Sequence, residues 1–175
     1  ETPMRLACLG LALILSAPLA IPAGASDNRP VGTTANVHAG LPMLTVHRHP
    51  SCGCCGGWVQ HMRQAGFPVN VVNVDDVMAP KRRLGVPDPQ ASCHTTEVAG
   101  YVVEGHVPAG DIQRLLRERP AARGLVLPGM PLGSPGMEAP DGRRQAYTVQ
   151  LLGHDGRLST FQHHPASAGK RSPAR

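Results

Sequence analysis

Aromatic side chains are scarce in this chain of 175 residues: they make up 3% of it, although 41% of the residues are hydrophobic. Any core must therefore be built from aliphatic side chains and methionine. The sequence also lacks a Ser–His–Asp pattern, a phosphate-binding loop and the glycine set of a dinucleotide-binding fold. Glu97 and Glu104 are not arranged as a catalytic carboxylate pair. These absences give no support to a hydrolase, a nucleotide-binding enzyme or a dehydrogenase.

Long hydrophobic runs are also lacking, except for one at the N-terminus. It follows a short basic region, covers residues 6–21 and ends at small residues at positions 23–25. Two prolines interrupt it, and it is short for a membrane span of about 20 residues. We therefore expect a cleaved signal peptide over residues 1–25, export to the periplasm, and no stable membrane span after cleavage.

The charge and composition of the remaining chain indicate one domain with polar extensions. The net charge is +5, but the basic residues are scattered, which indicates a solvated basic surface and no nucleic-acid partner. Small polar residues without hydrophobic periodicity predict a flexible leader over residues 26–42. The domain is expected to cover residues 43–164, followed by a disordered tail over residues 165–175.

Hydrophobic patterns in residues 43–164 predict an α/β domain. Strands are expected over residues 43–47, 69–74 and 97–103, and helices over residues 54–64, 75–84 and 108–118. Residues 119–144 are expected to be a loop, and the turn at residues 154–156 predicts a C-terminal β-hairpin. A strand, a CxxC turn at a helix N-terminus and a second strand form the thioredoxin arrangement. The expected fold class is therefore thioredoxin-like, with a central mixed sheet.

The cysteine-rich turn is the main functional signal. Of five cysteines, Cys8 leaves with the signal peptide, and Cys52, Cys54 and Cys55 gather in this turn. Free N–H groups and the helix dipole stabilise thiolates there. The Cys52/Cys55 pair could form a structural disulfide, act as a redox dithiol or bind a soft metal ion. The extra thiol of Cys54 would scramble simple disulfide exchange, and it therefore favours the metal site.

A second cluster, Cys93-His94, precedes the third predicted strand. In a thioredoxin-like topology this point lies opposite the CxxC turn, where thioredoxins have a cis-proline. Alone, Cys93 would be interpreted as a buried small side chain and His94 as a surface residue. Together, opposite a CxxC pair, they are expected to complete a metal site with Cys52 and Cys55.

The identity of the metal depends on the other donors. Thiolates and thioethers prefer copper(I), whereas a closed set of three cysteines and one histidine would suit zinc. Met130 and Met137 lie in a stiff loop rich in glycine and proline, and as ligands they would favour copper(I); the alternative is packing. His106 is another candidate ligand, and the His163-His164 pair is expected to be solvated and is assigned no metal.

The chain resembles a bacterial family of small exported proteins, domain-of-unknown-function family 411, over about residues 43–164. The likeness rests on unusual motifs that occur in order: PSCGCCGGW at 50–58, LGVP at 84–87, SCHT at 92–95, YVVEGHVP at 101–108 and GMPLGSPGME at 129–138. The resemblance implies a thioredoxin-like fold and an association with copper handling or copper tolerance.

Together these observations predict a periplasmic copper(I)-binding protein that sequesters the ion, provides tolerance, or delivers the ion to another copper protein or transporter. Cys52 and Cys55 would be the primary ligands and Cys54 or Cys93 the third. His94 and the two loop methionines would tune access. The alternative is a thiol–disulfide oxidoreductase with Cys52 as the nucleophile and Cys55 as the resolving thiol. A zinc-stabilised interaction module is a weaker third hypothesis.

Overall fold

A computed structural model describes residues 40–169 of the chain. The predicted signal peptide (1–25), most of the predicted leader (26–42) and residues 170–175 of the predicted tail lie outside the described residues. Within the described range, no helix has the length and apolar character needed to cross a membrane.

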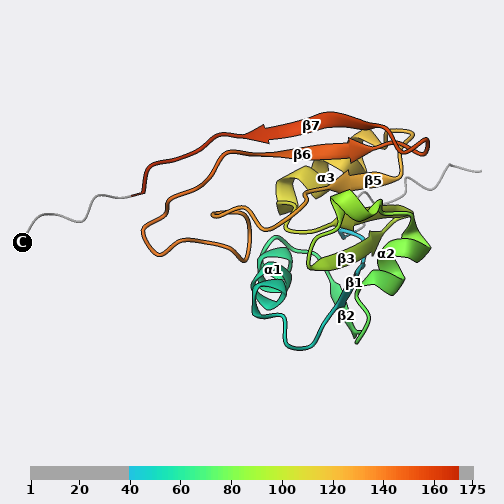
Figure 1. Cartoon of the computed structure of the whole chain (residues 1–175), viewed down its shortest axis with the longest axis horizontal. Helices are drawn as coiled ribbons and strands as arrows, with labels where there is room; N and C mark the ends of the chain where they lie inside the picture. Colours follow the sequence, from blue (N-terminus) through green and yellow to red (C-terminus); the bar gives the residue numbers. More distant parts are fainter. Residues whose placement is uncertain (1–39, 170–175) are drawn as a thin grey trace, which may run out of the picture. The chain divides into compact units, whose positions relative to one another are not determined.

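The described residues form an α/β domain around one mixed sheet, in which seven strands follow the order β2-β1-β3-β4-β5-β6-β7 (Figure 1). The β1–β2 and β4–β5 pairs are parallel and the other pairs are antiparallel. The elements are β1 (Leu44–Arg48), α1 (Gly53–Gln64), β2 (Val69–Asn73), α2 (Met78–Leu84), the 3-10 helix η1 (Asp88–Gln90), β3 (His94–Val98), β4 (Tyr101–Glu104), α3 (Ala109–Glu118), β5 (Gly124–Val126), β6 (Tyr147–Leu152) and β7 (Leu158–His164).

The predicted strand–turn–helix–strand unit is present as β1, α1 and β2. The two strands are parallel, with Leu44 opposite Val69. Along α1, Trp58, Val59 and Met62 recur at helical spacing and are buried in the core. The unit therefore places the cysteine turn where β1 leads into α1.

The two faces of the sheet carry different elements. Leu44 and Val46 of β1 belong to the aliphatic core that includes side chains of α1 and α3. The side chains that alternate with them along β1, including His47, point to the opposite face, because side chains of a strand alternate between faces. On that face α2 contacts the sheet, and its Arg83 bonds to Glu97 of β3. The helices thus cover both faces.

The prediction of a single strand over residues 97–103 is wrong. The structure has two antiparallel strands, β3 and β4, joined by a tight turn at Ala99-Gly100. Both turn residues have positive φ, 47° and 87°, as two-residue hairpin turns that match strand twist require. Alanine is not a residue type that indicates positive φ. The apolar residues on either side of Ala99 therefore predict one continuous strand.

A further strand lies inside the segment predicted to be a loop, residues 119–144. This strand, β5, has three residues, all buried, and pairs in parallel with β4. It begins at Gly124, where an added Cβ would collide with the carbonyl oxygen of Val102. Glycine therefore allows the close strand approach here, but so short a strand lacks a readable alternating pattern.

The C-terminal hairpin is formed by β6 and β7, as predicted, and β7 extends to His164. Beyond it, Ser167 in the predicted tail pairs with Arg144 through two backbone hydrogen bonds of 3.0 and 3.1 Å. This pairing ties the end of the described chain to the segment that leads into β6.

Candidate metal centre

The cysteine turn begins α1. Cys52 is the N-cap residue, and its Sγ accepts the backbone N–H of Cys55 at 3.4 Å. A disulfide joins Cys52 to Cys55, whereas Cys54 and Cys93 are free thiols. The CxxC pair is therefore in its oxidised form, and these two sulfurs become thiolate ligands only after a two-electron reduction.

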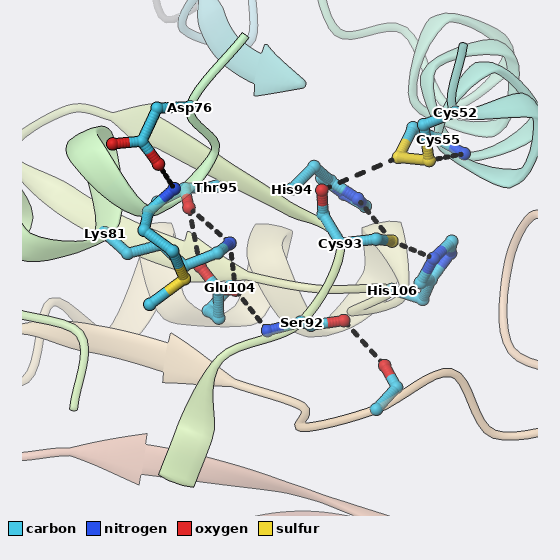
Figure 2. A network of polar contacts seen from close by, with 12 residues as sticks. Cys52, Cys55, Asp76, Lys81, Ser92, Cys93, His94, Thr95, Glu104 and His106 are labelled. Atoms are coloured by element: carbon cyan, nitrogen blue, oxygen red, sulfur yellow. Dashed lines mark hydrogen bonds and ion pairs between the residues drawn. A yellow bond between two sulfur atoms is a disulfide. The ribbon is translucent and has the colours of Figure 1, made fainter. Parts of the chain in front are cut away.

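The antiparallel pairing of β1 and β3 brings Cys93 to this turn. Arg48, the last residue of β1, lies opposite His94, the first residue of β3. The residue before His94 therefore lies next to the chain that leaves β1 for the cysteine turn (Figure 2). A side chain 39 positions away from Cys54 in sequence thus becomes its neighbour.

The four sulfurs form one group. Cys54 Sγ lies 3.5 Å from Cys52 Sγ and 4.0 Å from Cys93 Sγ, and Cys55 Sγ lies 3.9 Å from the carbonyl oxygen of Cys93. All four Sγ atoms fall within 4.8 Å of one another. Such a spacing lets several sulfurs contact the same soft metal ion, or bridge neighbouring ions, after small side-chain rotations.

His106 extends this group toward the core. Its Nδ1 lies 2.7 Å from the carbonyl oxygen of Pro135, and its Nε2 lies 2.8 Å from Cys93 Sγ. A carbonyl oxygen only accepts, so Nδ1 carries the proton and Nε2 presents its lone pair to the thiol. Metal-binding histidines are commonly oriented in this way by a backbone carbonyl.

His94 lies beside Cys93 and is fully buried. Its ring stacks at a tilt on Trp58, with centroids 4.5 Å apart, and its Nδ1 lies 3.4 Å from Cys93 Sγ. Its Nε2 has no hydrogen-bond partner among the described residues. Burial, with smaller contributions from nearby positive groups, holds the pKa of His94 well below its usual value. The imidazole is therefore neutral near pH 7, the form that binds metals.

Burial lowers the pKa of the histidines in this group and raises the pKa of one of its cysteines. The pKa of His106 is lowered, chiefly by burial. Burial and the neighbouring Cys54 thiol raise the pKa of Cys93 to about 12. Cys93 is therefore protonated near pH 7, and a metal ion that binds it must displace the proton. Cys93 lies just before β3, outside the helix N-terminus where thiolates are expected to be stabilised.

The methionines lie on the loop between β5 and β6. Met130 is half-exposed, and its Sδ lies 3.8 Å from Cys54 Sγ. Met137 is partly buried, and its backbone bonds within the loop to Ser134 and Gly133. Among residues 40–169, no hydrogen bond links the thioether of Met137 to the cysteines. The structure thus brings one of the two methionines directly to the sulfur group.

The loop between β5 and β6 that carries Met130 and Met137, here the methionine loop, contacts the cysteine turn through two glycines. A Cβ added to Gly57 would lie 2.9 Å from the Cα of Gly136. Gly136 has a φ of +83°, and a Cβ there would lie 2.5 Å from the carbonyl oxygen of Cys54. The loop backbone therefore lies directly on the first turns of α1, and glycine is required on both sides of the contact.

Comparison with known proteins decides the family. Two solved structures, Forms 1 and 2 of a copper resistance protein CopG, are 46% identical to this chain, with TM-scores of 0.67 and 0.68. They match 71% of this chain and 98% and 99% of their own. A family described as "Protein of unknown function, DUF411" matches residues 90–137. The chain belongs to the DUF411 family. No curated protein matches the sequence.

The fold of the DUF411 protein thus brings together more candidate metal ligands than the sequence alone assigned to the site. Cys93, His94 and His106 form a second group whose donor atoms lie within 4.8 Å of one another. His106 was only an alternative from sequence, because it follows Cys93 by 13 residues and becomes its neighbour through the β3–β4 hairpin. The signal that could have found it is a histidine two residues after the end of an apolar strand, in Gly105-His106.

The other histidine pair of the DUF411 protein lies on β7, apart from the sulfur group. His163 bonds to Thr148 across the hairpin, and its side chain is exposed as expected. His164 is not simply solvated: its Nε2 lies 2.7 Å from Asp111 Oδ2, and its ring stacks on Tyr147. This contact ties the hairpin to the first turn of α3 and needs no metal to explain it.

Proposed function

We propose that this DUF411 protein is an exported, periplasmic protein that binds copper(I) for sequestration, tolerance or delivery. The observation that carries the proposal is the group of four cysteine sulfurs within 4.8 Å of one another, with a thioether and two neutral imidazoles beside it. The similarity to solved structures of a copper resistance protein supports copper as the ion.

The reduced protein provides the ligands. Cys52 and Cys55 are the primary ligands once their disulfide is reduced, and Cys54 or Cys93 is the third. His94 and Met130 tune access, and Met137 contributes through the shape of its loop. The half-exposed Met130 and the part-buried Cys54 leave the ion open to ligand exchange, which suits transfer to another copper protein or a transporter.

Copper(I) fits this donor set better than zinc does. Thiolates and thioethers are soft ligands that copper(I) prefers, and a methionine adds little to a zinc site. A zinc-stabilised interaction module would instead need a closed tetrahedral set, and its metal would leave only when the domain unfolds. The half-exposed thioether at the rim therefore favours copper(I).

The test is an anaerobic titration of the reduced mature protein with copper(I) against a competing chromophoric chelator. We expect stoichiometric binding that withstands the chelator and is lost in Cys52→Ser and in Cys55→Ser. Thr148→Ser, on the hairpin away from the sulfurs, is the matched control and should bind as the wild type does. Full copper affinity in both cysteine variants would contradict the site assignment.

A thiol–disulfide oxidoreductase is the second candidate, and the Cys52–Cys55 disulfide is the observation that favours it. In this hypothesis Cys52 attacks a substrate disulfide and Cys55 resolves the mixed disulfide, so that the substrate is reduced and the CxxC pair oxidised. A stable mixed disulfide trapped by Cys55→Ser, together with turnover of a dithiol reductant, would support it. Both proposals include the hypothesis that the β1–α1–β2 unit is related to the corresponding unit of the thioredoxin fold.

A further inference from the structure

A buried ion pair lies next to the metal centre and supplies none of its ligands. Lys81 of α2 and Glu104 of β4 are 1% and 0% exposed, and their charged atoms lie 2.6 Å apart. Charged side chains are rarely buried so completely, because removing them from water costs several kcal/mol. Replacing such a pair by apolar side chains is often neutral for stability, so stability alone does not explain this one.

The carboxylate of Glu104 is fully engaged. Its Oε1 accepts from Lys81 Nζ and from the backbone N–H of Ser92, both at 2.6 Å. Its Oε2 accepts from the hydroxyl of Thr95 at 2.7 Å, and that hydroxyl accepts from Lys81 at 3.0 Å. The carboxylate therefore holds the chain on both sides of Cys93, at Ser92 and at Thr95 (Figure 2).

Ser92 connects this network to the methionine loop. Its hydroxyl donates to the carbonyl oxygen of Gly129, next to Met130, at 2.6 Å. Ser92 also fills the space beside Gly105, where an added Cβ would lie 2.7 Å from the Ser92 hydroxyl oxygen. One backbone segment thus connects the buried carboxylate, the Cys93 thiol and the loop that carries the thioether.

We infer that Glu104, with its charge compensated by Lys81, is a positioning residue of the copper site. It holds the Ser92 N–H and thereby orients the Cys93 thiol toward Cys54 and the methionine loop toward the cysteine turn. The inference rests on the proposed function. An apolar pair would fill the same space but would offer no acceptor to the part-buried Ser92 N–H, which would lose its hydrogen-bond partner in the protein.

Two double variants isolate that acceptor. Both replace the buried charges: Lys81→Met with Glu104→Gln retains a side-chain oxygen for the Ser92 N–H, and Lys81→Met with Glu104→Leu removes it. The first measurement is copper(I) affinity by chelator competition. We expect wild-type affinity in the glutamine variant and a loss of about 10- to 100-fold in the leucine variant, the usual effect of removing a residue that orients a ligand.

The second measurement needs no metal. The rate at which iodoacetamide alkylates Cys93 in the reduced, metal-free protein is followed by peptide mass mapping. We expect the leucine variant to be alkylated several-fold faster than the glutamine variant, because an untethered Ser92 lets the Cys93 thiol leave its part-buried position. If wild-type protein fails to bind copper, the proposed function fails, and this contrast still tests the positioning role.

Leu152→Ala, in the buried part of β6, is the control for general loosening. It should lower the thermal midpoint and leave copper affinity and Cys93 alkylation unchanged. Equal affinities and equal alkylation rates in the two double variants, whether high or low, would overturn the positioning role. The same follows if Leu152→Ala reproduces both effects of the leucine variant.

Discussion

At the scale of single residues, the metal centre depends on side chains whose acid–base behaviour is set by burial. Cys93 is a thiol with a pKa of about 12, raised by burial and by Cys54. His94 and His106 are neutral imidazoles, with pKa values lowered chiefly by burial. The sequence indicates which residue types are present at these positions. It does not indicate their burial, which depends on the sheet partner of each strand.

Copper(I) binding is predicted to release the proton of Cys93. Because the thiol is protonated at every pH below about 12, its contribution to the affinity should rise about tenfold per pH unit across neutral pH. Chelator competition between pH 6.5 and 8 measures this slope. Cys93→Ser should reduce the slope by one proton per bound ion. A slope unchanged by this substitution would mean that Cys93 is not a ligand.

His94 is predicted to make the fold less stable in mild acid. Its pKa is lowered in the folded protein, so below the unfolded-state value of about 6.5 the unfolded chain binds a proton that the folded chain does not. Stability from neutral His94 is complete above that pH and is lost as the pH falls, by about 1.4 kcal/mol per unit. Urea unfolding between pH 7 and 5 measures the loss. His94→Phe, which retains a ring beside Trp58, should make the dependence of the unfolding free energy on pH shallower. An unchanged dependence would contradict the role of His94 in the loss of stability.

At the scale of elements, the metal centre is a meeting of four segments. The N-cap and first turn of α1, the residues at the start of β3, the turn after β4 and the loop after β5 each supply part of it. The turn and the helix were predictable from sequence, because the glycines, the CxxC spacing and the apolar face of α1 are local signals. The β3–β4 hairpin was not, because Ala99 adopts positive φ without a residue type that indicates it.

The contact between the methionine loop and α1 is predicted to tolerate no side chain at Gly136. Gly136→Ala places a Cβ against the Cys54 carbonyl at positive φ, and should lower the free energy of unfolding by about 1–3 kcal/mol. Gly142→Ala has a similar φ of +75° with nothing within 4 Å, so it isolates the backbone strain. Urea unfolding compares the two, and equal losses would mean that the contact adds nothing.

The loop should also distinguish its two thioethers. Met130→Leu removes the sulfur that lies 3.8 Å from Cys54, and Met137→Leu removes one that makes no such contact in the described part of the chain. We expect the first substitution to weaken copper(I) binding more than the second, which should have only a modest effect. Paired chelator titrations check the order, and the reverse order would assign the coordinating thioether to Met137.

At the scale of the whole molecule, copper(I) is predicted to stabilise the fold, because the ligands come from segments that only the folded chain brings together. Free copper(I) at about 100 times the dissociation constant should add about 2.7 kcal/mol to the free energy of unfolding. Thermal unfolding of the reduced protein with and without the ion measures this gain. Cys52→Ser should lose most of it, and an equal gain in that variant would indicate binding elsewhere.

The mixed α/β character of the domain and the cysteine cluster follow from sequence, because their signals are local and repeated along the chain. The short strand β5 and the position of His106 do not, because both depend on pairing between distant segments. The buried Lys81–Glu104 pair is also invisible in the sequence, where two charged residues predict an exposed surface. The parts that orient the candidate ligands are therefore those that only the three-dimensional structure reveals.

The most direct test of the central claim is X-ray absorption at the copper edge of the reduced protein loaded anaerobically with copper(I). If the four cysteine sulfurs bind the ion, the absorption edge should be typical of copper(I) and the coordination shell should be dominated by sulfur. Cys52→Ser and Cys55→Ser should each remove part of that sulfur shell. A shell dominated by nitrogen or oxygen, or a sulfur shell unchanged in both variants, would contradict copper binding at the cysteine turn.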